Sequence, residues 1–136
     1  MDWMGNTLIV LGETIPNVLK PNSGCTIGIA PRHMDSNHGM KLCKLGHEYY
    51  GCLVMSSDLP KPLYASFYRN AGTAILCSSG IIKADNVHFY YDNQFNLYVR
   101  AETGSLIMPI VLNMDGDIYM EFISYNDWPS GLTQIV

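Results

Sequence analysis

Charged side chains are scarce in this sequence, since Asp, Glu, Lys and Arg make up 15% of its 136 residues, against roughly 25% in an average globular domain. The eight Lys and Arg residues are scattered and the formal net charge is -4. A nucleic-acid-binding protein concentrates basic residues in a patch or stripe, so we expect no nucleic-acid partner. Asn, Ser, Thr, Gly and nine Tyr take the place of the missing charges. This composition is typical of β proteins whose faces pack against other sheets or other subunits.

Long apolar runs and helical periodicity are also missing. The sequence contains no stretch of about 18 apolar residues, so we expect no insertion into a membrane. No window has apolar residues at the i, i+3, i+4, i+7 spacing together with capping residues. We therefore predict no long helix.

Recognisable catalytic and metal-binding motifs are absent as well. Nothing matches G-x-S-x-G, H-E-x-x-H or a P-loop, and we predict no enzymatic activity and no cofactor. Zinc-ligand types occur, without the paired C-x2-C spacing of a zinc site, at Cys43, His47 and Cys52, with His33 or His38 as a further ligand. We predict no metal. The twelve acidic residues leave a carboxylate pair for glycoside hydrolysis open, but their spacing selects none.

The four cysteines lie in apolar, strand-like surroundings. Two bridges among them would allow three connectivities. In a chain of this size with no cysteine density, the low count favours buried free thiols over a disulfide framework. The residues are Cys25, Cys43, Cys52 and Cys77.

Turn-forming residues divide the rest of the chain into short β-prone runs. Clusters of Gly, Pro, Asn and Asp recur roughly every 8 to 12 residues, which is the pattern of a sandwich or barrel. We predict an all-β fold, an antiparallel β-sandwich of jelly-roll-like or meander type. Residues 1–24 are expected to form an extended neck or N-terminal strand segment, and residues 25–136 the sandwich. The expected strands are 7–11, 26–30, 41–45, 50–55, 63–68, 73–77, 80–84, 87–91, 95–101, 107–113 and 117–124.

The clearest hairpin is predicted at residues 87–101. A three-residue loop at 92–94 would place Val87 opposite Val99, Phe89 opposite Leu97 and Tyr91 opposite Phe95, so that the apolar sides match. The other side of this hairpin carries Tyr90, Tyr98, Arg100, Asn96 and His88.

This polar aromatic side is the first candidate binding surface. Rings stack on sugars or on partner side chains, and the amide and guanidinium groups orient a ligand by hydrogen bonds. The alternative is that this side packs against a second sheet or another subunit. A second candidate is the polar loop at 32–39, which contains His33 and His38.

A second hairpin is predicted at residues 107–124, with a three-residue loop that ends at Gly116. In this register Ile110 and Leu112 join Ile118, Met120 and Phe122 in the core. Pro109 lacks a backbone donor, so its strand is expected to lie at an edge or to begin there. The outward residues are Val111, Tyr119 and Ile123. Such an apolar outer side predicts self-association into a symmetric homo-oligomer.

A resemblance to a known class of proteins adds a function. Residues 81–99 read IIKADNVHFYYDNQFNLYV, and residues 14–21 read TIPNVLKP. The first stretch, with the strand-rich close after it, resembles the distal domains of phage tail fibres and related receptor-binding proteins, and the second would suit a neck that leads into such a head. The resemblance covers roughly residues 81–136 and implies a homotrimer, a β-sandwich head in the virion, and non-catalytic binding of a cell-surface glycan or protein.

The resulting expectation is a receptor-binding and structural module, trimeric, that contacts its ligand through Tyr90, Tyr98 and Arg100 or through the 33–38 loop. Two alternatives remain open from the sequence. One is a small sandwich enzyme that acts on a saccharide through two convergent carboxylates. The other is a virion or assembly protein that binds only other proteins.

Overall fold

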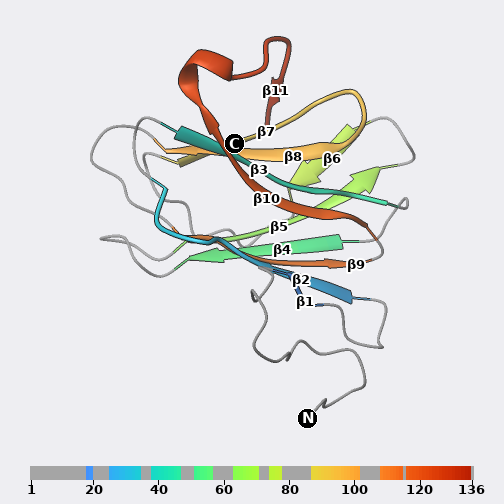
Figure 1. Cartoon of the computed structure of the whole chain (residues 1–136). Coiled ribbons are helices and arrows are strands. Elements are labelled where there is room, and N and C mark those ends of the chain that lie inside the picture. The colour runs from blue at the N-terminus through green and yellow to red at the C-terminus, as the bar shows by residue number, and fades with distance from the viewer. Residues whose placement is uncertain are drawn as a thin grey trace.

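The computed structural model describes residues 18–19, 25–34, 38–46, 51–56, 63–70, 74–77, 87–101, 108–114 and 116–135. These residues form two antiparallel sheets packed face to face (Figure 1), which confirms the predicted all-β sandwich. Among them the one helix is η2 (Tyr125–Asp127), a single 3-10 turn. No helix in this part of the chain is long and apolar enough to cross a membrane.

The chain alternates between the two sheets, as it does in jelly-roll-like sandwiches. One sheet has the order β1 (Val18–Leu19), β2 (Cys25–Ile29), β9 (Ile110–Met114), β4 (Gly51–Ser56), β5 (Leu63–Asn70) and β6 (Ala74–Cys77). The other has the order β10 (Ile118–Ser124), β3 (His38–Lys44), β8 (Asn96–Ala101), β7 (Val87–Tyr91) and β11 (Thr133–Gln134). The chain passes between the sheets after β2, β3, β6, β8 and β9, as sandwich folds with crossing connections do.

Two of the predicted strands, at 7–11 and 80–84, lie outside the described residues. The end of the predicted neck contributes β1, which pairs with β2. Most of the other predicted strands are found within a few residues of their predicted ends, whereas β11 and η2 had no counterpart in the prediction.

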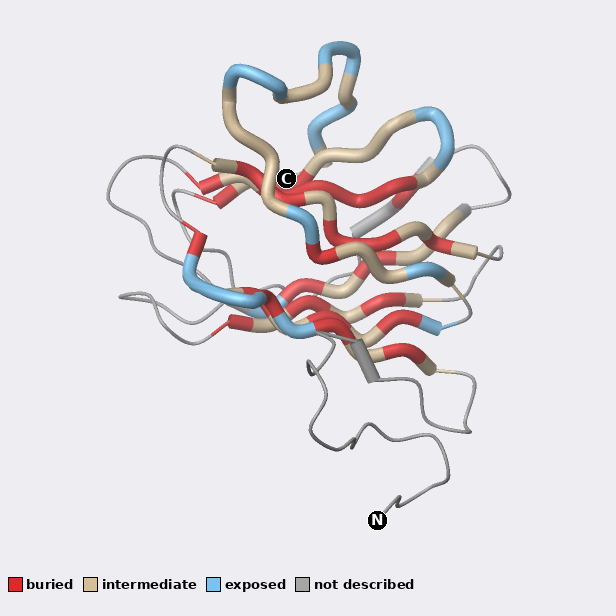
Figure 2. The backbone as a smooth tube through the Cα atoms, viewed as in Figure 1, coloured by how far each residue is buried: buried red, intermediate tan, exposed pale blue. Residues whose placement is uncertain are grey.

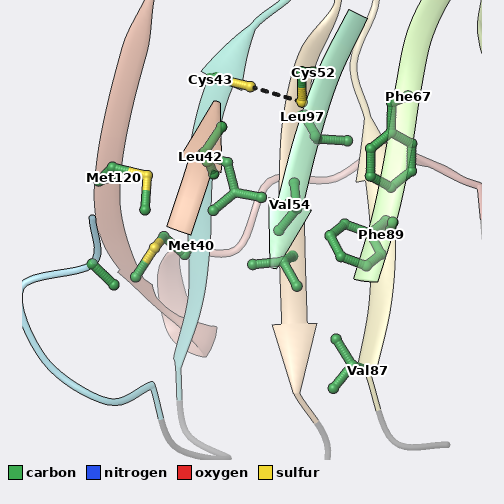
Figure 3. Packing of buried hydrophobic residues seen from close by; sticks show 14 of the residues in the cluster. Met40, Leu42, Cys43, Cys52, Val54, Phe67, Val87, Phe89, Leu97 and Met120 are labelled. Carbon is green, nitrogen blue, oxygen red and sulfur yellow. Dashed lines mark hydrogen bonds between the residues drawn. The ribbon is translucent and has the colours of Figure 1, made fainter. Parts of the chain in front are cut away.

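The core lies between the sheets and is built by alternate residues of each strand, because successive side chains of a strand point to opposite faces. Buried segments line the inner sides of both layers in Figure 2. In Figure 3, Val54 and Phe67 of the six-stranded sheet meet Leu42, Phe89 and Leu97 of the five-stranded sheet. The ring centroids of Phe67 and Phe89 are 4.9 Å apart.

Two cysteines meet inside this core. The Sγ atoms of Cys43 on β3 and Cys52 on β4 are 3.9 Å apart (Figure 3), and both thiols are free and buried. Cys25 is also a free thiol and is partly exposed. The prediction of buried free thiols therefore holds at Cys43 and Cys52, whereas Cys25 is free but not buried. The hydrogen bond with Cys52, burial and the nearby Cys52 sulfur raise the pKa of Cys43 well above its usual value, so this thiol stays protonated.

The hairpin at 87–101 forms with the predicted faces but in a different register. Tyr91 pairs with Leu97 and Phe89 with Val99, so the partner of each β7 residue lies two positions further along the chain than predicted. The loop is displaced because Asp92 and Asn96 are joined by a backbone hydrogen bond and Phe95 adopts a left-handed φ of 64°. Because side chains alternate between the two faces of a strand, a register shift of two residues keeps every side chain on its predicted side.

The hairpin predicted at 107–124 does not form. Strand β9 pairs with β2 and β4 in one sheet, whereas β10 pairs with β3 in the other. Val111, predicted to face outward, is fully buried, and Ile110 and Leu112, predicted in the core, lie on the outer side of the six-stranded sheet. The strand was expected to lie at an edge or to begin at Pro109. It begins there, since β9 starts with the next residue, and it lies between β2 and β4.

Contacts at the β9–β10 connection explain the crossing. The side-chain amide of Asn113 donates from Nδ2 to the carbonyl oxygens of Lys44 and Asp117, at 2.9 and 3.3 Å. A Cβ atom at Gly116 would lie 2.0 Å from the Lys44 oxygen. The glycine that suggested a hairpin loop is therefore needed for close approach to β3.

Candidate functional site

The C-terminal strap, residues 125–135, crosses the outer face of the five-stranded sheet. It leaves β10 at one edge, turns through η2, and returns at the opposite edge, where β11 pairs with β7 (Figure 1). Ser124 begins the turn by accepting a hydrogen bond from the Asn126 amide, and the Tyr125 hydroxyl donates to the Ala101 carbonyl oxygen at 2.6 Å. The strap is one of the most exposed parts of the described chain (Figure 2).

Trp128 fastens the strap to the sheet. Its ring lies directly against Gly39 of β3, where an added Cβ atom would be 1.9 Å from Cζ3. The indole centroid lies 5.8 Å from that of Tyr90, 5.9 Å from Tyr98 and 6.3 Å from Tyr125, each in an edge-to-face arrangement. Such pairs stabilise by about 0.5–1.5 kcal/mol beyond their buried area.

Arg100 joins this aromatic cluster from β8. Its guanidinium carbon lies 4.0 Å from the Tyr125 ring centroid and 5.6 Å from that of Trp128. A guanidinium within about 6 Å of a ring centroid is attracted by the negative face of the ring. We call Tyr90, Tyr98, Arg100, Tyr125 and Trp128 the strap cluster.

Asp92 supports the strap cluster from the turn of the β7–β8 hairpin. Its carboxylate accepts hydrogen bonds from the Gln94 amide, the Asn96 amide and side chain, and the Tyr98 hydroxyl, at 2.8 to 3.0 Å. Burial alone would raise the pKa of Asp92, but the hydrogen bonds from Asn96, Gln94 and Tyr98 outweigh it and lower the pKa. The carboxylate is consequently ionised at neutral pH, where it acts as an acceptor.

Tyr98 shows the reciprocal effect. Burial and the hydrogen bond to the Asp92 carboxylate raise the pKa of Tyr98 to about 12. Its side chain is only 6% exposed and Asn96 is 5% exposed. These two predicted ligand residues act inside the fold, where they bind and orient Asp92.

The other predicted residues of the hairpin lie nearer to solvent. Tyr90, His88 and Arg100 are partly exposed, and Gln134 of the strap approaches His88, with 3.4 Å between Nε2 and Nδ1. The sequence alternative placed a second sheet or another subunit on this side of the hairpin, whereas the described residues place the strap there. The covering element is a segment of the same chain.

The two predicted histidines do not join this group. His33 is exposed, and His38 begins strand β3, so it does not belong to a loop. The His38 ring lies 6.2 Å from Phe122, on the opposite side of the sheet from the outward-facing Arg100. His38 therefore lies on the other side of this sheet from the hairpin surface. Residues 35–37 lie outside the described part.

Tyr125 and Trp128 are the cluster members that sequence reasoning missed. The segment 126–131 contains Asn, Asp, Pro, Ser and Gly, a composition that indicates a turn. The available signal was Trp128 itself, because a large aromatic residue amid turn formers has to bury its ring somewhere.

Among the described residues, no group of three His, Cys, Asp or Glu side chains is placed to hold a metal ion. His47, named above as a ligand type, lies outside them. No family model, curated protein or solved structure matches the chain.

Proposed function

We propose that this domain is a non-enzymatic recognition module that binds a cell-surface glycan or protein with the strap side of the sandwich. The observation that carries the proposal is the strap cluster, which gathers three partly exposed rings and a guanidinium on one outer face. Rings of this kind stack on the apolar faces of sugars or on partner side chains, while nearby polar groups set the orientation of the ligand.

Polar groups at the rim of the strap cluster complete this chemistry. His88 and Gln134 approach each other beside Tyr90, and Asn126, Asp127 and Ser130 of the strap are exposed. Amide, imidazole and hydroxyl groups supply both donors and acceptors, which sugar hydroxyls require.

The all-β sandwich is the architecture that the resemblance to phage tail fibre heads implies. The sandwich is compatible with the further proposal that the domain is the distal, homotrimeric receptor-binding head of a fibre in a virion. A saccharide-cleaving enzyme is the less favoured function, because the low pKa of Asp92 and its four hydrogen bonds suit a fixed acceptor and not a general acid.

A matched pair of tyrosine variants tests the proposal. Tyr90→Ala removes a ring from the strap cluster, whereas Tyr64→Ala removes a ring that is 40% exposed on the outer side of the other sheet. We expect Tyr90→Ala to weaken binding to a glycan array or to host cells about tenfold, a loss equivalent to one stacked ring. Tyr64→Ala should bind like the wild type.

Two results would refute the proposal. One is a wild-type chain that binds neither glycans nor cells. The other is equal binding by the two variants, each shown by circular dichroism to be folded.

A further inference from the structure

Two buried thiols meet between the two sheets. The Sγ atoms of Cys43 on β3 and Cys52 on β4 are 3.9 Å apart (Figure 3), a distance at which the two sulfur atoms are in contact. Both side chains are buried. Because β3 belongs to the five-stranded sheet and β4 to the six-stranded sheet, a bond between these two sulfurs would join the two layers of the sandwich directly.

A β-bulge in β3 turns Cys43 into the core. Lys41 pairs with Tyr98 of β8. Two residues later, Cys43 pairs with Leu97, which is only one residue away on β8, so β3 contains one extra residue at this place. Strict alternation would put Cys43 on the outer side together with Lys41, whereas with the bulge the neighbouring residues Leu42 and Cys43 are both buried. Bulges redirect individual side chains in this way.

The side chain of Cys25 projects away from this core. Its neighbour Thr26 on β2 and Cys52 on β4 both pair with Asn113 of β9, and residues paired across strands share one face of the sheet. Thr26 therefore faces inwards with Cys52, and Cys25 faces outwards, because successive side chains alternate between the faces. Cys25 and Cys52 lie on opposite sides of the six-stranded sheet and cannot form a bond.

The backbone of Cys77 is too far from that of Cys52 for a bond. Both residues pair with Phe67 of the intervening strand β5, so their Cα atoms are separated by two strand spacings, about 9.6 Å. A disulfide requires Cα atoms within about 7 Å of each other. In the described part of the chain, Cys43 is therefore the one cysteine that is placed to bond to Cys52.

We propose that Cys43 and Cys52 form a disulfide bond when the chain folds in an oxidising medium, and that this bond fastens the two sheets to each other. The oxidant is a small disulfide such as oxidised glutathione. One cysteine thiolate attacks a sulfur of this disulfide, forms a mixed disulfide and releases one glutathione thiolate. The second cysteine thiolate then attacks the cysteine sulfur of the mixed disulfide and releases the other. The glutathione thiolates take up the two protons that the cysteines lose, so the cysteines give up two electrons and one glutathione disulfide is reduced.

Burial determines when this reaction can take place. In the folded chain both sulfurs are shielded from a molecule of the size of glutathione. The hydrogen bond with Cys52 and burial also raise the pKa of Cys43, and the thiolate is the form that reacts. The mixed disulfide therefore forms before the sandwich closes, and folding brings the second sulfur into contact with it. The bond lies between the sheets and the strap cluster lies outside them, so this proposal does not depend on the proposed ligand.

The cross-link should raise the thermal stability of the chain. A disulfide mainly removes conformational freedom from the unfolded chain, and it removes less when the closed loop is short. Cys43 and Cys52 are nine positions apart in the sequence. For a loop of this length we expect the thermal midpoint of the oxidised chain to lie about 5–10 °C above that of the reduced chain.

Refolding in a glutathione redox buffer tests the proposal. The reduced, unfolded wild-type chain is refolded with oxidised and reduced glutathione, alkylated in denaturant, digested without reduction and examined by mass spectrometry. We expect a pair of peptides joined through Cys43 and Cys52, with Cys25 and Cys77 alkylated. Oxidised glutathione added to the chain after it has folded in the reduced state should produce the same cross-link much more slowly. Thermal unfolding of the oxidised and reduced proteins, followed by circular dichroism, measures the shift in midpoint.

Two alanine variants assign the shift to this pair of cysteines. Cys52→Ala removes one of the two sulfurs and should unfold at the same temperature in oxidising and reducing buffer. Cys25→Ala is the matched control, because it removes a thiol from the outer side of the same sheet and should keep the full difference. Each variant is compared with itself in the two buffers, so any loss of stability from the substitution itself cancels.

Three results would overturn the proposal. The first is a wild-type chain in which all four cysteines are alkylated after refolding with oxidised glutathione, or in which other cysteines are joined. The second is a cross-link between Cys43 and Cys52 that leaves the thermal midpoint unchanged. The third is a redox-dependent midpoint that persists in Cys52→Ala. Equally fast cross-linking of the folded and the refolding chain would contradict the proposed order of steps.

Discussion

The two outer faces of the sandwich carry different residues and differ in how far the chain covers them. The five-stranded sheet carries tyrosines and charged residues on its outer side, and the chain returns over them as a strap pinned by Trp128. The six-stranded sheet carries aliphatic residues on its outer side, and three of its large apolar residues are more than a third exposed. The strap shields the first face within the chain, whereas the second keeps large apolar side chains in contact with water.

The difference implies that substitutions on the two faces differ in their effect on stability. Removal of a strap contact should lower the free energy of unfolding of the chain. Truncation of an exposed side chain on the outer side of the six-stranded sheet should leave the chain almost as stable as before.

The largest loss is expected from Trp128→Ala. Truncation of a fully buried Trp costs about 3–5 kcal/mol, and Trp128 is partly exposed, so we expect a loss of about 2–4 kcal/mol in urea unfolding. Ile29→Ala on the outer side of the six-stranded sheet is the control, with an expected loss under about 1 kcal/mol. Equal losses for the two variants would mean that Trp128 stabilises the fold no more than an exposed side chain of the other sheet does.

Gly39→Ala should cost about 1–3 kcal/mol, because the new methyl group would overlap the Trp128 ring and force it to move. The cost should largely vanish in the Trp128→Ala background, where the ring is absent, and a double-mutant cycle measures this coupling. Gly51→Ala in the six-stranded sheet, where the new Cβ would lie 3.3 Å from the backbone oxygen of Phe67 on the neighbouring strand, should cost less. A Gly39→Ala cost that persists without Trp128 would contradict the close contact.

Asp92→Asn should cost about 1–2 kcal/mol at pH 7, because a carboxylate that accepts four hydrogen bonds becomes an amide with one acceptor oxygen. The pKa of Asp92 is lower in the folded chain than in the unfolded one. Its stabilisation is therefore complete above the unfolded value of about 3.9 and is lost as the pH falls through the folded value. The variant should show a shallower loss of stability between about pH 5 and pH 2.

The exposed carboxylate of Asp127 is the control for this pH dependence. Asp127→Asn should reproduce the acid limb of the wild type when unfolding is followed at each pH. If Asp92→Asn gave the same acid limb as the wild type, the hydrogen-bond network would not be what stabilises the turn.

The smallest effect is expected from Met114→Ser on the outer side of the six-stranded sheet. The side chain is 51% exposed in the single chain, so the free energy of unfolding of dilute protein should change by less than about 1 kcal/mol. Chemical denaturation at low concentration measures it. A loss above about 2 kcal/mol would mean that part of the chain itself covers this position.

The β7–β8 hairpin shows how far local pattern can be trusted. Its strands and its core-facing residues followed from the alternation of Val87, Phe89, Leu97 and Val99, and the structure confirms them. The register was wrong because a turn is set by individual hydrogen bonds. Asp92 accepts from two backbone amides and Phe95 takes a left-handed conformation, and neither choice is visible in a hydrophobic pattern.

The candidate site was predictable in part for the same reason. Tyr90 and Arg100 were placed on one side of the hairpin by alternation, and they do share a cluster. Their neighbour Trp128 is 28 residues from Arg100 in the sequence. No local pattern joins such residues, because the contact depends on the path of the strap across the sheet.

Strand β9 marks the boundary between what the sequence determined and what the tertiary structure decided. Alternation established that Ile110 and Leu112 share one side and that Val111 and Asn113 share the other. Both sides begin with aliphatic residues, so hydrophobicity alone could not select the inner one. The choice was made by the crossing to β10, where buried Asn113 binds the carbonyl oxygens of Lys44 and Asp117. A buried amide needs such partners, and only the packed pair of sheets supplies them.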